Sequence, residues 1–495
     1  MRILMVYPRF ADALWAYKHA LAFVGKRASS PPLGLLTVAA MLPEAWDKKL
    51  VDLNVAELSD DDLRWADCVF LSAMLAQQAS AEAVIARCQR LGIKIVAGGP
   101  LYTHSEQAGG LGVDHVVVGE AEGCLPALVR DLEHGRAAPI YKATDWPDLQ
   151  HTPPPLWRLA NQSAYSLMAV QFTRGCPYDC EFCDVVALNG FRPRLKGGAQ
   201  VLAELDALYC SGWRGHVFVC DDNLLGNSRR ARVALLPAIG EWMGAHNFPF
   251  VLTAAVSVDL AEDDEVMRLM VEAGFDRVTV GIESPDDGSL AECGKFQNRG
   301  RDLLAAVRRM QSHGLEVQGG FIVGFDNDPA AIFERQIQFV QASGIATAMV
   351  SVLFAFPGTR LHHRLRQEHR LLPLRLADTA YGLLNYVPRM GGDALVAGHK
   401  QILTAIYAPQ PYYERVKRFL EAYQPPRAGR RRLEPEHIRT FFRALWLLGV
   451  VDGARGYFWR LLSYALLRRA RSFPVAARLA VTGYFFRKDV EDYIG

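Results

Sequence analysis

Three cysteines stand close together in one short segment, at spacings of four and three residues. They are Cys176, Cys180 and Cys183. Three thiolates in this arrangement suit a [4Fe–4S] cluster. Three protein ligands leave one iron open, where a chelating small molecule can bind. The alternatives are a zinc site or three unrelated buried thiols. Zinc prefers a fourth Cys or His ligand, and none occurs from Asp184 up to Cys210.

The cysteine segment resembles the signature of the radical S-adenosylmethionine (SAM) superfamily, in which an aromatic residue, here Phe182, precedes the last cysteine. The resemblance implies that the open iron binds the amino and carboxylate groups of SAM. It also implies that an electron from the cluster breaks a C–S bond and releases a 5′-deoxyadenosyl radical. Homolytic hydrogen abstraction needs no acid or base, so we expect no catalytic triad.

Motifs at the ends of later strands match the same superfamily in their order. The resemblance implies that an Asp-Asp-Asn motif after the second strand lies near the SAM amino group. It places a Gly-Ile-Glu-Ser motif after the fourth strand against the ribose or methionine, and a glycine after the fifth against the adenine. A buried acidic residue at a strand end can equally be a helix cap or an ion-pair partner. The candidate SAM contacts are Phe182, Asp221, Asp222, Asn223, Glu283, Ser284 and Gly324.

Ahead of the cysteines, residues 1–140 alternate between apolar runs and stretches with helical spacing. Turn residues such as Gly98-Gly99-Pro100 follow several of the apolar runs. Five strands with intervening helices predict a Rossmann-like α/β domain, whose ligand crevice lies at the carboxyl ends of the strands. The predicted strands are 2–7, 50–55, 68–74, 94–97 and 115–118.

An α/β domain in front of a radical SAM domain resembles the cobalamin-binding domain of B12-dependent radical SAM enzymes. Small residues at strand ends let a large flat ligand approach the backbone. The motif Asp-x-His-x-x-Gly of better-known cobalamin domains is absent after the first strand. We therefore expect cobalamin without a histidine on the lower face of cobalt, which Met74 or Leu75 shields instead. The alternatives are that both are ordinary core or loop residues, or that the domain is purely structural. The candidate cobalamin contacts are Ser72, Met74, Gly98, Gly99, Gly119 and Glu120.

Residues 164–370 repeat a strand and a helix with a regularity that predicts a full or partial TIM barrel. The proline-rich residues 141–163 between the two α/β regions are predicted to be a linker. Functional residues of such barrels lie where strands end and loops begin. The predicted strands are 167–173, 216–221, 250–256, 276–282, 317–323 and 347–353, and the predicted helices are 199–210, 229–246, 262–273, 300–313, 329–343 and 357–369.

Residues 371–495 lose the strand pattern and predict a helical region. Between residues 427 and 488 there are fourteen basic and three acidic residues, interleaved with aromatic side chains. One interpretation is peripheral contact with an anionic membrane surface, which suits a lipid-like substrate. The alternative is a set of helices that pack on the barrel and leave their arginines in water.

Charge and cysteine usage narrow the class of protein. The 55 basic and 53 acidic residues give a net charge of +2, which predicts no nucleic-acid partner. Nine cysteines, six of them scattered, do not form a dense disulfide framework and suit a reducing cytoplasm. The N-terminus is predicted to be a strand and no signal peptide. The longest apolar run near the C-terminus is far below the ~20 residues of a membrane span.

Further motifs resemble a hopanoid C-2 methylase-like subgroup of B12-binding radical SAM proteins, which has a helical C-terminal region. They are Pro31–Leu35 with Met41–Pro43, and Gly319–Asp326. The resemblance implies that one SAM methylates cobalamin, while a second starts the radical transfer of that methyl group to an unactivated carbon. The implied substrate is a small or lipid-like molecule between the two domains, with an electron donor such as flavodoxin or ferredoxin. The alternatives are a radical rearrangement or oxidation, and a non-catalytic B12 or iron–sulfur sensor.

Overall fold

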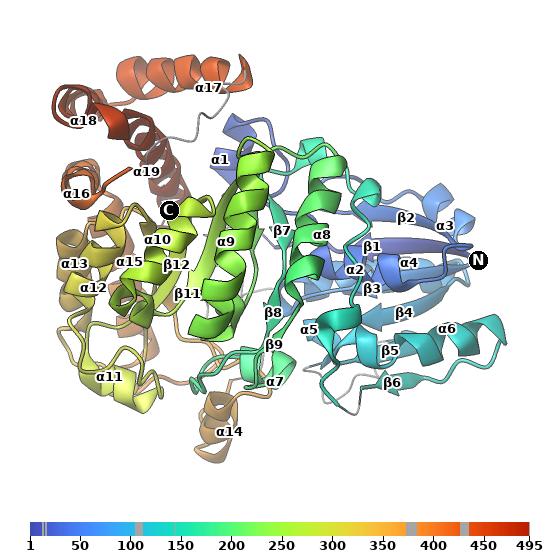
Figure 1. Ribbon diagram of the computed structural model, residues 1–495. Helices are drawn as coiled ribbons and strands as arrows, with labels where there is room; N and C mark the ends of the chain where they lie inside the picture. The colour runs from blue at the N-terminus through green and yellow to red at the C-terminus, as the bar shows by residue number, and fades with distance from the viewer. Residues whose placement is uncertain are drawn as a thin grey trace.

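Two parallel sheets stand side by side, and a group of helices covers the far side of the second sheet (Figure 1). The N-terminal sheet is blue and cyan, the second sheet is green and yellow, and the C-terminal helices are orange and red. The computed structural model describes residues 1–11, 14, 17–103, 112–143, 145–372, 384–425 and 435–494.

The N-terminal sheet has six parallel strands in the order β2-β1-β3-β4-β5-β6. The order reverses between β1 and β3, so the loops after these two strands border the crevice where doubly wound sheets bind ligands. Apolar residues of β1 and β3 are buried on both faces, as expected for parallel strands. The strands are β1 Arg2–Tyr7, β2 Asp47–Asp52, β3 Cys68–Ser72, β4 Lys94–Gly98, β5 His115–Val118 and β6 Ile140–Lys142.

Helices cover both faces of this sheet. Leu35 of α2 and Leu128 of α6 belong to the hydrophobic core on one face. Val84 of α4 and Leu101 of α5 belong to the core on the other face. The helices are α1 Lys18–Phe23, α2 Leu33–Met41, α3 Asp60–Trp65, α4 Gln78–Arg90, α5 Pro100–Thr103 and α6 Leu125–Glu133.

The second sheet is an open βα barrel with the strand order β14-β13-β12-β11-β10-β7 and parallel pairing throughout. Its strands are β7 Met168–Val170, β10 Gly215–Val219, β11 Phe250–Val256, β12 Phe275–Glu283, β13 Glu316–Val323 and β14 Ala348–Val352. Its helices are α8 Gly198–Cys210, α9 Arg229–Ala245, α10 Asp264–Glu272, α11 Asp287–Glu292, α12 Leu303–Ser312, α13 Ile332–Ser343 and α14 Arg360–Gln367. The predicted partial barrel is confirmed.

A short antiparallel pair interrupts the barrel after β7. The two strands are β8 Thr173–Arg174 and β9 Arg194–Leu195. They enclose the cysteine segment and α7, which spans Val185–Asn189.

The C-terminal helices pack against the edge of the barrel. Helix α15 contacts α13 and β14, and the Tyr407 hydroxyl on α15 donates to the Ala348 carbonyl at 2.8 Å. Within the described residues, no helix is long and apolar enough to cross a membrane. The elements are α15 Gly392–Tyr407, α16 Pro409–Ala422, α17 Pro435–Trp446, the π-helical turn η10 Leu447–Val451, α18 Arg455–Arg468 and α19 Phe473–Ile494.

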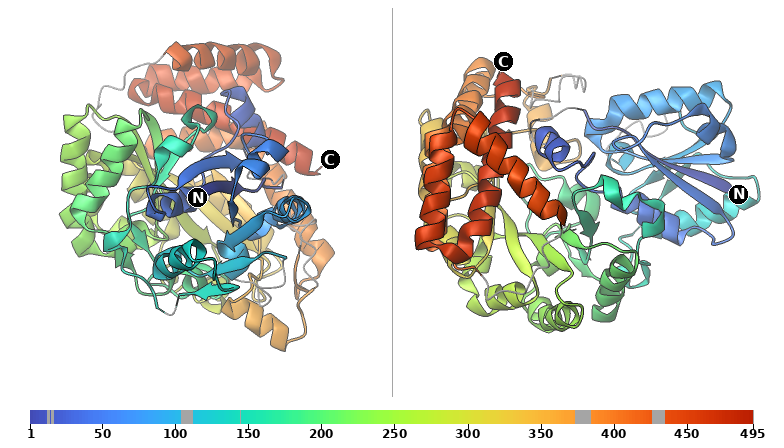
Figure 2. Two further views of the ribbon diagram at one scale, coloured as in Figure 1. Left: turned by 90° about the vertical axis from the view of Figure 1, so that its right-hand side faces the viewer. Right: turned by 90° about the horizontal axis from the view of Figure 1, so that it is seen from above.

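Helices α1 and α19 connect the N-terminal and C-terminal regions of the chain. Helix α1 lies beside α19 (Figure 2), and the ring centroids of Phe23 and Phe485 are 5.0 Å apart. A second contact joins the N-terminal domain to the chain after residue 163, because the buried Tyr165 hydroxyl donates to Asp52 at 2.9 Å. The predicted linker begins within β6 and contains the single turns η4 Leu149–His151 and η5 Trp157–Leu159. Its Trp157 is buried.

Candidate active site

The three cysteines of the signature lie on the loop between β8 and α7, at the carboxyl end of the barrel sheet. All three are free thiols. Burial raises the pKa of Cys183 to about 12 and also raises the pKa of Cys176 and of Cys180. Cys180 also raises the pKa of each of the other two thiols. The Lys295 ammonium acts in the opposite direction and lowers the pKa of all three. The thiols therefore share one electrostatic environment.

This donor set fits a [4Fe–4S] cluster. Three Cys thiolates supply the ligands that iron–sulfur clusters use. Among the described residues, no three His, Cys, Asp or Glu side chains are placed to hold a single metal ion. A cube of irons and sulfides is larger than one ion, so its ligands stand at wider spacing. Cys176, Cys180 and Cys183 would hold three irons, and the fourth iron would remain open to the amino and carboxylate groups of SAM.

Asp221 and Asp222, which follow β10, are turned toward the cysteine loop. Asp221 is 2% exposed and accepts backbone N–H bonds from Phe172, Thr173 and Leu225 at 2.7 to 2.9 Å. Burial raises its pKa to about 7. With both carboxylate oxygens engaged, Asp221 orders the backbone before the cysteines.

Asp222 and Asn223 make two further contacts around the loop. Asp222 accepts the Gly175 N–H at 2.8 Å, directly before Cys176, and an amide N–H of Asn189 at 3.0 Å. Asn223 donates to the Ser257 hydroxyl and is buried. The Asp-Asp-Asn motif therefore holds the cysteine loop against the neighbouring strand end.

Glu283 ends β12 in a left-handed backbone conformation with φ of 61°. A register shift between Gly281 and Glu283 turns this side chain into the site, where it pairs with Lys295 at 2.8 Å. A Cβ on Gly281 would lie 2.2 Å from the Glu283 carboxylate and 2.8 Å from Lys295 Nζ, so a larger residue there would displace this ion pair. Ser284 follows and is fully buried.

The remaining candidate SAM contacts lie on the next strand end and on the cysteine loop. Gly324 has φ of 111° and donates its N–H to Asp328 at 2.7 Å. Phe182 packs on Phe325 with ring centroids 6.0 Å apart. The barrel thus brings Phe182, the ends of β10, β12 and β13, and the cysteines to one edge of the sheet.

Three residues after α11 belong to the same site and were missed from the sequence. Lys295 pairs with Glu283. Gln297 donates an amide N–H to Cys180 Sγ at 3.8 Å. Asn298 donates to the carbonyls of Gly281 and Ile282 at 2.9 and 3.0 Å. They follow no strand end, so the rule that placed the other candidates did not reach them.

At the edge of the N-terminal sheet, the candidate cobalamin residues cluster around β3, β4 and β5. Gly98 is the last residue of β4. Gly99 has φ of 92°, and a Cβ there would lie 2.7 Å from the Ser72 hydroxyl. Gly119 donates its N–H to the Thr103 hydroxyl at 3.1 Å. These strand ends are thus closely packed, with small residues at the surface that a flat ligand would meet.

Met74 stands at the point where the strand order reverses. Its side chain is 46% exposed, while its N–H donates to Gln77 at 2.8 Å. Gln77 is fully buried and donates to the Pro8 carbonyl at 2.5 Å. The glutamine therefore ties the loop after β3 to the loop after β1 and leaves the Met74 side chain at the crevice.

Glu120 joins the two domains through an ion-pair network. It contacts Arg194 with both oxygens and Arg174 at 2.8 Å, while Glu122 contacts Arg174 at 2.7 Å. Arg174 precedes Gly175 and Cys176 in the chain. The four charged side chains of the network are at most 16% exposed. The network therefore fixes the loop after β5 to the cysteine loop.

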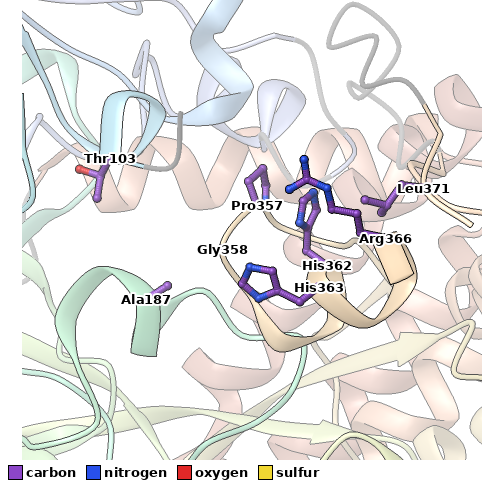
Figure 3. A pocket seen from close by; sticks show the side chains of 8 residues that line it. All are labelled: Thr103, Ala187, Pro357, Gly358, His362, His363, Arg366 and Leu371. Carbon is purple, nitrogen blue, oxygen red and sulfur yellow. The ribbon is translucent and has the colours of Figure 1, made fainter. Parts of the chain in front are cut away.

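A cavity of about 510 Å³ opens between the two domains. Thr103 faces it from the N-terminal domain, Ala187 from α7, and His362, His363 and Arg366 from α14 (Figure 3). Helix α14 is held to the cysteine loop by Arg364, whose guanidinium pairs with Glu181 at 2.7 Å. The cavity is thus bordered by elements next to the cysteine loop and by the end of α5, next to the candidate cobalamin contacts.

Comparisons with known proteins agree with this division of the chain. Residues 27–129 match the B12 binding domain, and residues 170–340 match the radical SAM superfamily. Residues 359–494 match a domain of unknown function, DUF4070. The fold and site define a radical SAM enzyme with an N-terminal B12-binding domain.

Two curated relatives extend the match over nearly the whole chain. An uncharacterized methyltransferase of Synechocystis sp. is 37% identical over 468 residues, which are 93% of this chain and 86% of that protein. The hopanoid C-2 methylase of Rhodopseudomonas palustris is 32% identical over 484 residues, which are 94% and 90% of the two chains. The chain belongs to this family of cobalamin-binding radical SAM methyltransferases.

Solved structures share the fold. The methyltransferase TsrM from Kitasatospora setae, with cobalamin and a [4Fe–4S] cluster bound, has a TM-score of 0.65 at 16% identity and covers 98% of this chain and 99% of its own. OxsB, with aqua-cobalamin and SAM bound, has a TM-score of 0.64 at 15% identity and covers 99% and 80%. The predicted fold class and the predicted cofactors, a [4Fe–4S] cluster, SAM and cobalamin, are confirmed.

Proposed function

We propose that the protein transfers a methyl group to an unactivated carbon of a lipid-like substrate, which it takes up from the inner surface of a membrane. When bound, the cluster supplies SAM cleavage and the cobalamin supplies the methyl group. The chain's own residues hold the two cofactor sites at a fixed separation and exclude water. The observation that carries the proposal is an exposed apolar surface on the C-terminal helices α17 and α18.

The cavity is suited to hold the reacting part of the substrate. Ala187 on its wall lies four residues after Cys183, and Thr103 is bonded to Gly119 at the cobalamin-binding edge. A carbon in this space would lie between the two cofactor sites. Radical methyl transfer requires such a position, because the deoxyadenosyl radical and the methyl donor must both reach the same carbon.

The apolar surface, here called the helical patch, lies on α17, η10 and α18. Leu467 is 81% exposed and Trp446 is 65% exposed. Such a group of large exposed apolar side chains marks an interaction site rather than ordinary surface. The patch consists of Phe442, Trp446, Val450, Val451, Trp459, Leu466 and Leu467.

The packing of these helices uses other residues. Ala444, Leu448, Phe458 and Leu461 are buried in the main hydrophobic core, so the helices remain attached to the barrel without the patch. Basic side chains flank the exposed residues, among them Arg439, Arg455, Arg460, Arg468 and Arg471. Apolar side chains with neighbouring arginines match the chemistry of an anionic bilayer surface, where each basic residue contributes about 1 kcal/mol.

The proposed reaction needs an electron donor and a lipid-like substrate. SAM cleavage requires a low-potential electron, for which a small donor such as flavodoxin or ferredoxin is suited. The reduced cluster and the free thiols suit the cytoplasmic side of the membrane. The relative named hopanoid C-2 methylase supports a polycyclic, lipid-like substrate.

Vesicle binding tests the surface part of the proposal. The full chain should co-sediment with phosphatidylglycerol-containing vesicles and much less with phosphatidylcholine alone. Trp446→Glu combined with Leu467→Glu should weaken binding by about tenfold or more, because two apolar contacts are lost. The matched control is Ile140→Glu, which changes an exposed apolar residue on β6 and should bind as the wild type does. Equal binding of all three proteins would contradict the proposal.

Isotope transfer tests the reaction. Reconstituted protein is incubated with reductant, cobalamin, lipid extract and SAM carrying a deuterated methyl group. A lipid that gains the label supports the proposal. A product without added carbon would favour rearrangement or oxidation, and failure to cleave SAM would favour a sensor.

A further inference from the structure

Gln297 lies beside the cysteine loop without belonging to any motif assigned above. It stands in the segment between α11 and α12, two residues after Lys295. The same segment is tied to the cysteine loop by the backbone, since Glu181 donates its N–H to the Cys293 carbonyl at 2.8 Å. Gln297 is only 9% exposed. A flexible, polar side chain is thus held in the wall of the cluster site.

The amide nitrogen of Gln297 points at one cluster ligand. Its Nε2 lies 3.8 Å from Cys180 Sγ, so the amide donates a hydrogen bond to this sulfur. An N–H donor favours a negatively charged sulfur. Hydrogen bonds to cluster sulfurs are one of the means by which proteins set cluster potentials.

The amide oxygen of Gln297 has no hydrogen-bond partner within the described part of the chain, although it is buried. A buried acceptor without a donor is costly, and such groups call for an explanation. In a cluster held by the three thiols, the open iron would bind SAM through its methionine. The methionine amino group, even when its lone pair is given to iron, keeps N–H donors that can supply this acceptor.

We propose that Gln297 links the cluster to SAM, with its amide N–H donated to the Cys180 thiolate and its amide oxygen accepting an N–H of the SAM methionine amino group. One planar side chain then sets both the electron density on a cluster ligand and the orientation of the sulfonium donor. Gln297 is a positioning residue for reductive cleavage. The proposal rests on the radical SAM site and is independent of methyl transfer and of the lipid substrate.

Two substitutions separate the two halves of the proposal. Gln297→Leu removes both the donor and the acceptor, while Gln297→Glu removes the donor and keeps acceptor oxygens. The matched control is Gln311→Leu on α12. Gln311 is 1% exposed, donates to the Ser343 carbonyl at 3.3 Å and also has an unpartnered amide oxygen, but it is not part of the cluster site.

The readouts are the midpoint potential of the cluster without SAM, from an EPR-monitored redox titration, and SAM affinity, from the change of the reduced-cluster spectrum. Both Gln297 variants should have a more negative potential than the wild type, because a donor that stabilises the reduced cluster is lost. Gln297→Leu should bind SAM about tenfold more weakly, or worse. Gln297→Glu should keep at least wild-type affinity, and Gln311→Leu should change neither quantity.

Iron and sulfide content is measured first, and a Gln297→Leu protein that loses its cluster is replaced by Gln297→Met. A wild-type potential and wild-type SAM affinity in the apolar variant would overturn the proposal. A shifted potential with unchanged SAM affinity would overturn its SAM half. Because neither readout involves a product, failure of methyl transfer would leave these results unaffected.

Discussion

The ion pair between Glu120 and Arg194 determines how firmly the loop after β5 of the N-terminal sheet is fixed to the cysteine loop. The Arg194 guanidinium donates to Glu120 at 2.9 Å and to the carbonyls of Pro147 and Asn189 at 2.8 and 2.9 Å. The two charged side chains are 16% and 6% exposed. Arg194→Met keeps the length of the side chain and removes all these donors, so it loosens the linker, α7 and the loop after β5 together.

The free-energy cost of Arg194→Met can be estimated from the Glu120 carboxylate, which loses its partner. Removing one partner of a buried ion pair costs about 3–5 kcal/mol. Glu120 retains Arg174, but Glu122 shares that arginine, so we expect a value near the lower bound, about 3 kcal/mol. This free energy corresponds to an increase of about a hundredfold in the population with separated domains.

Limited trypsin digestion measures that population. Arg158 lies in η5 within the linker, next to the buried Trp157, and the backbone after it is hydrogen-bonded at Leu159 and Ala160, so trypsin must open this segment before it can cleave. Cleavage of such a transiently opened state tracks its equilibrium population when reclosing is fast. The fragment that ends at Arg158 should form about a hundredfold faster in Arg194→Met. Arg229→Met, which removes a surface ion pair with Asp263, should digest at the wild-type rate. Wild-type digestion of Arg194→Met would refute the reasoning.

Three further outcomes test single features of the site. Burial raises the pKa of Cys183 to about 12 and also raises the pKa of Cys176 and Cys180, so iron must displace protons from the thiols. Iron incorporation should therefore increase from about pH 7 to about pH 9. An amount of bound iron that does not change with pH would contradict this. Asp221→Asn places an N–H donor against backbone N–H groups such as that of Leu225 and should cost about 1–3 kcal/mol, measured as a lower midpoint of denaturant unfolding, whereas an unchanged midpoint would exclude the ordering role. Gly99→Ala puts a Cβ 2.7 Å from the Ser72 hydroxyl, so bound corrinoid should fall while iron content stays constant; full corrinoid content would place the ligand elsewhere.

Much of the fold could be predicted because parallel strands leave a strong sequence signal. The predicted barrel strand 250–256 coincides with β11, and the other predicted barrel strands overlap the observed ones. Strand β2 starts at Asp47 rather than residue 50 because it is an edge strand with exposed polar residues. Strand β6 was missed, since three residues in front of a proline-rich segment carry no periodic pattern.

The site was predictable only where function follows strand ends. The cysteine spacing identified the cluster ligands, and the strand-end rule brought Asp222 and Glu283 to the same edge. Neither the cysteine spacing nor the strand-end rule predicts which residues, distant in sequence, a side chain contacts in the folded protein. Glu120, a candidate cobalamin contact, pairs with Arg194, which is 74 residues away in sequence. The placement of Gln297 beside Cys180 depends in the same way on a contact across 117 residues.

Product stoichiometry tests the central claim most directly. Wild-type protein with an intact cluster is given reductant, SAM and lipid extract, with and without cobalamin. Cobalamin-dependent methylation predicts equal amounts of S-adenosylhomocysteine, 5′-deoxyadenosine and methylated lipid when cobalamin is present, and no methylated lipid without it. Replacing Cys176, Cys180 and Cys183 by alanine should abolish deoxyadenosine formation. Deoxyadenosine from the triple variant, or methylated lipid made without cobalamin, would contradict the account.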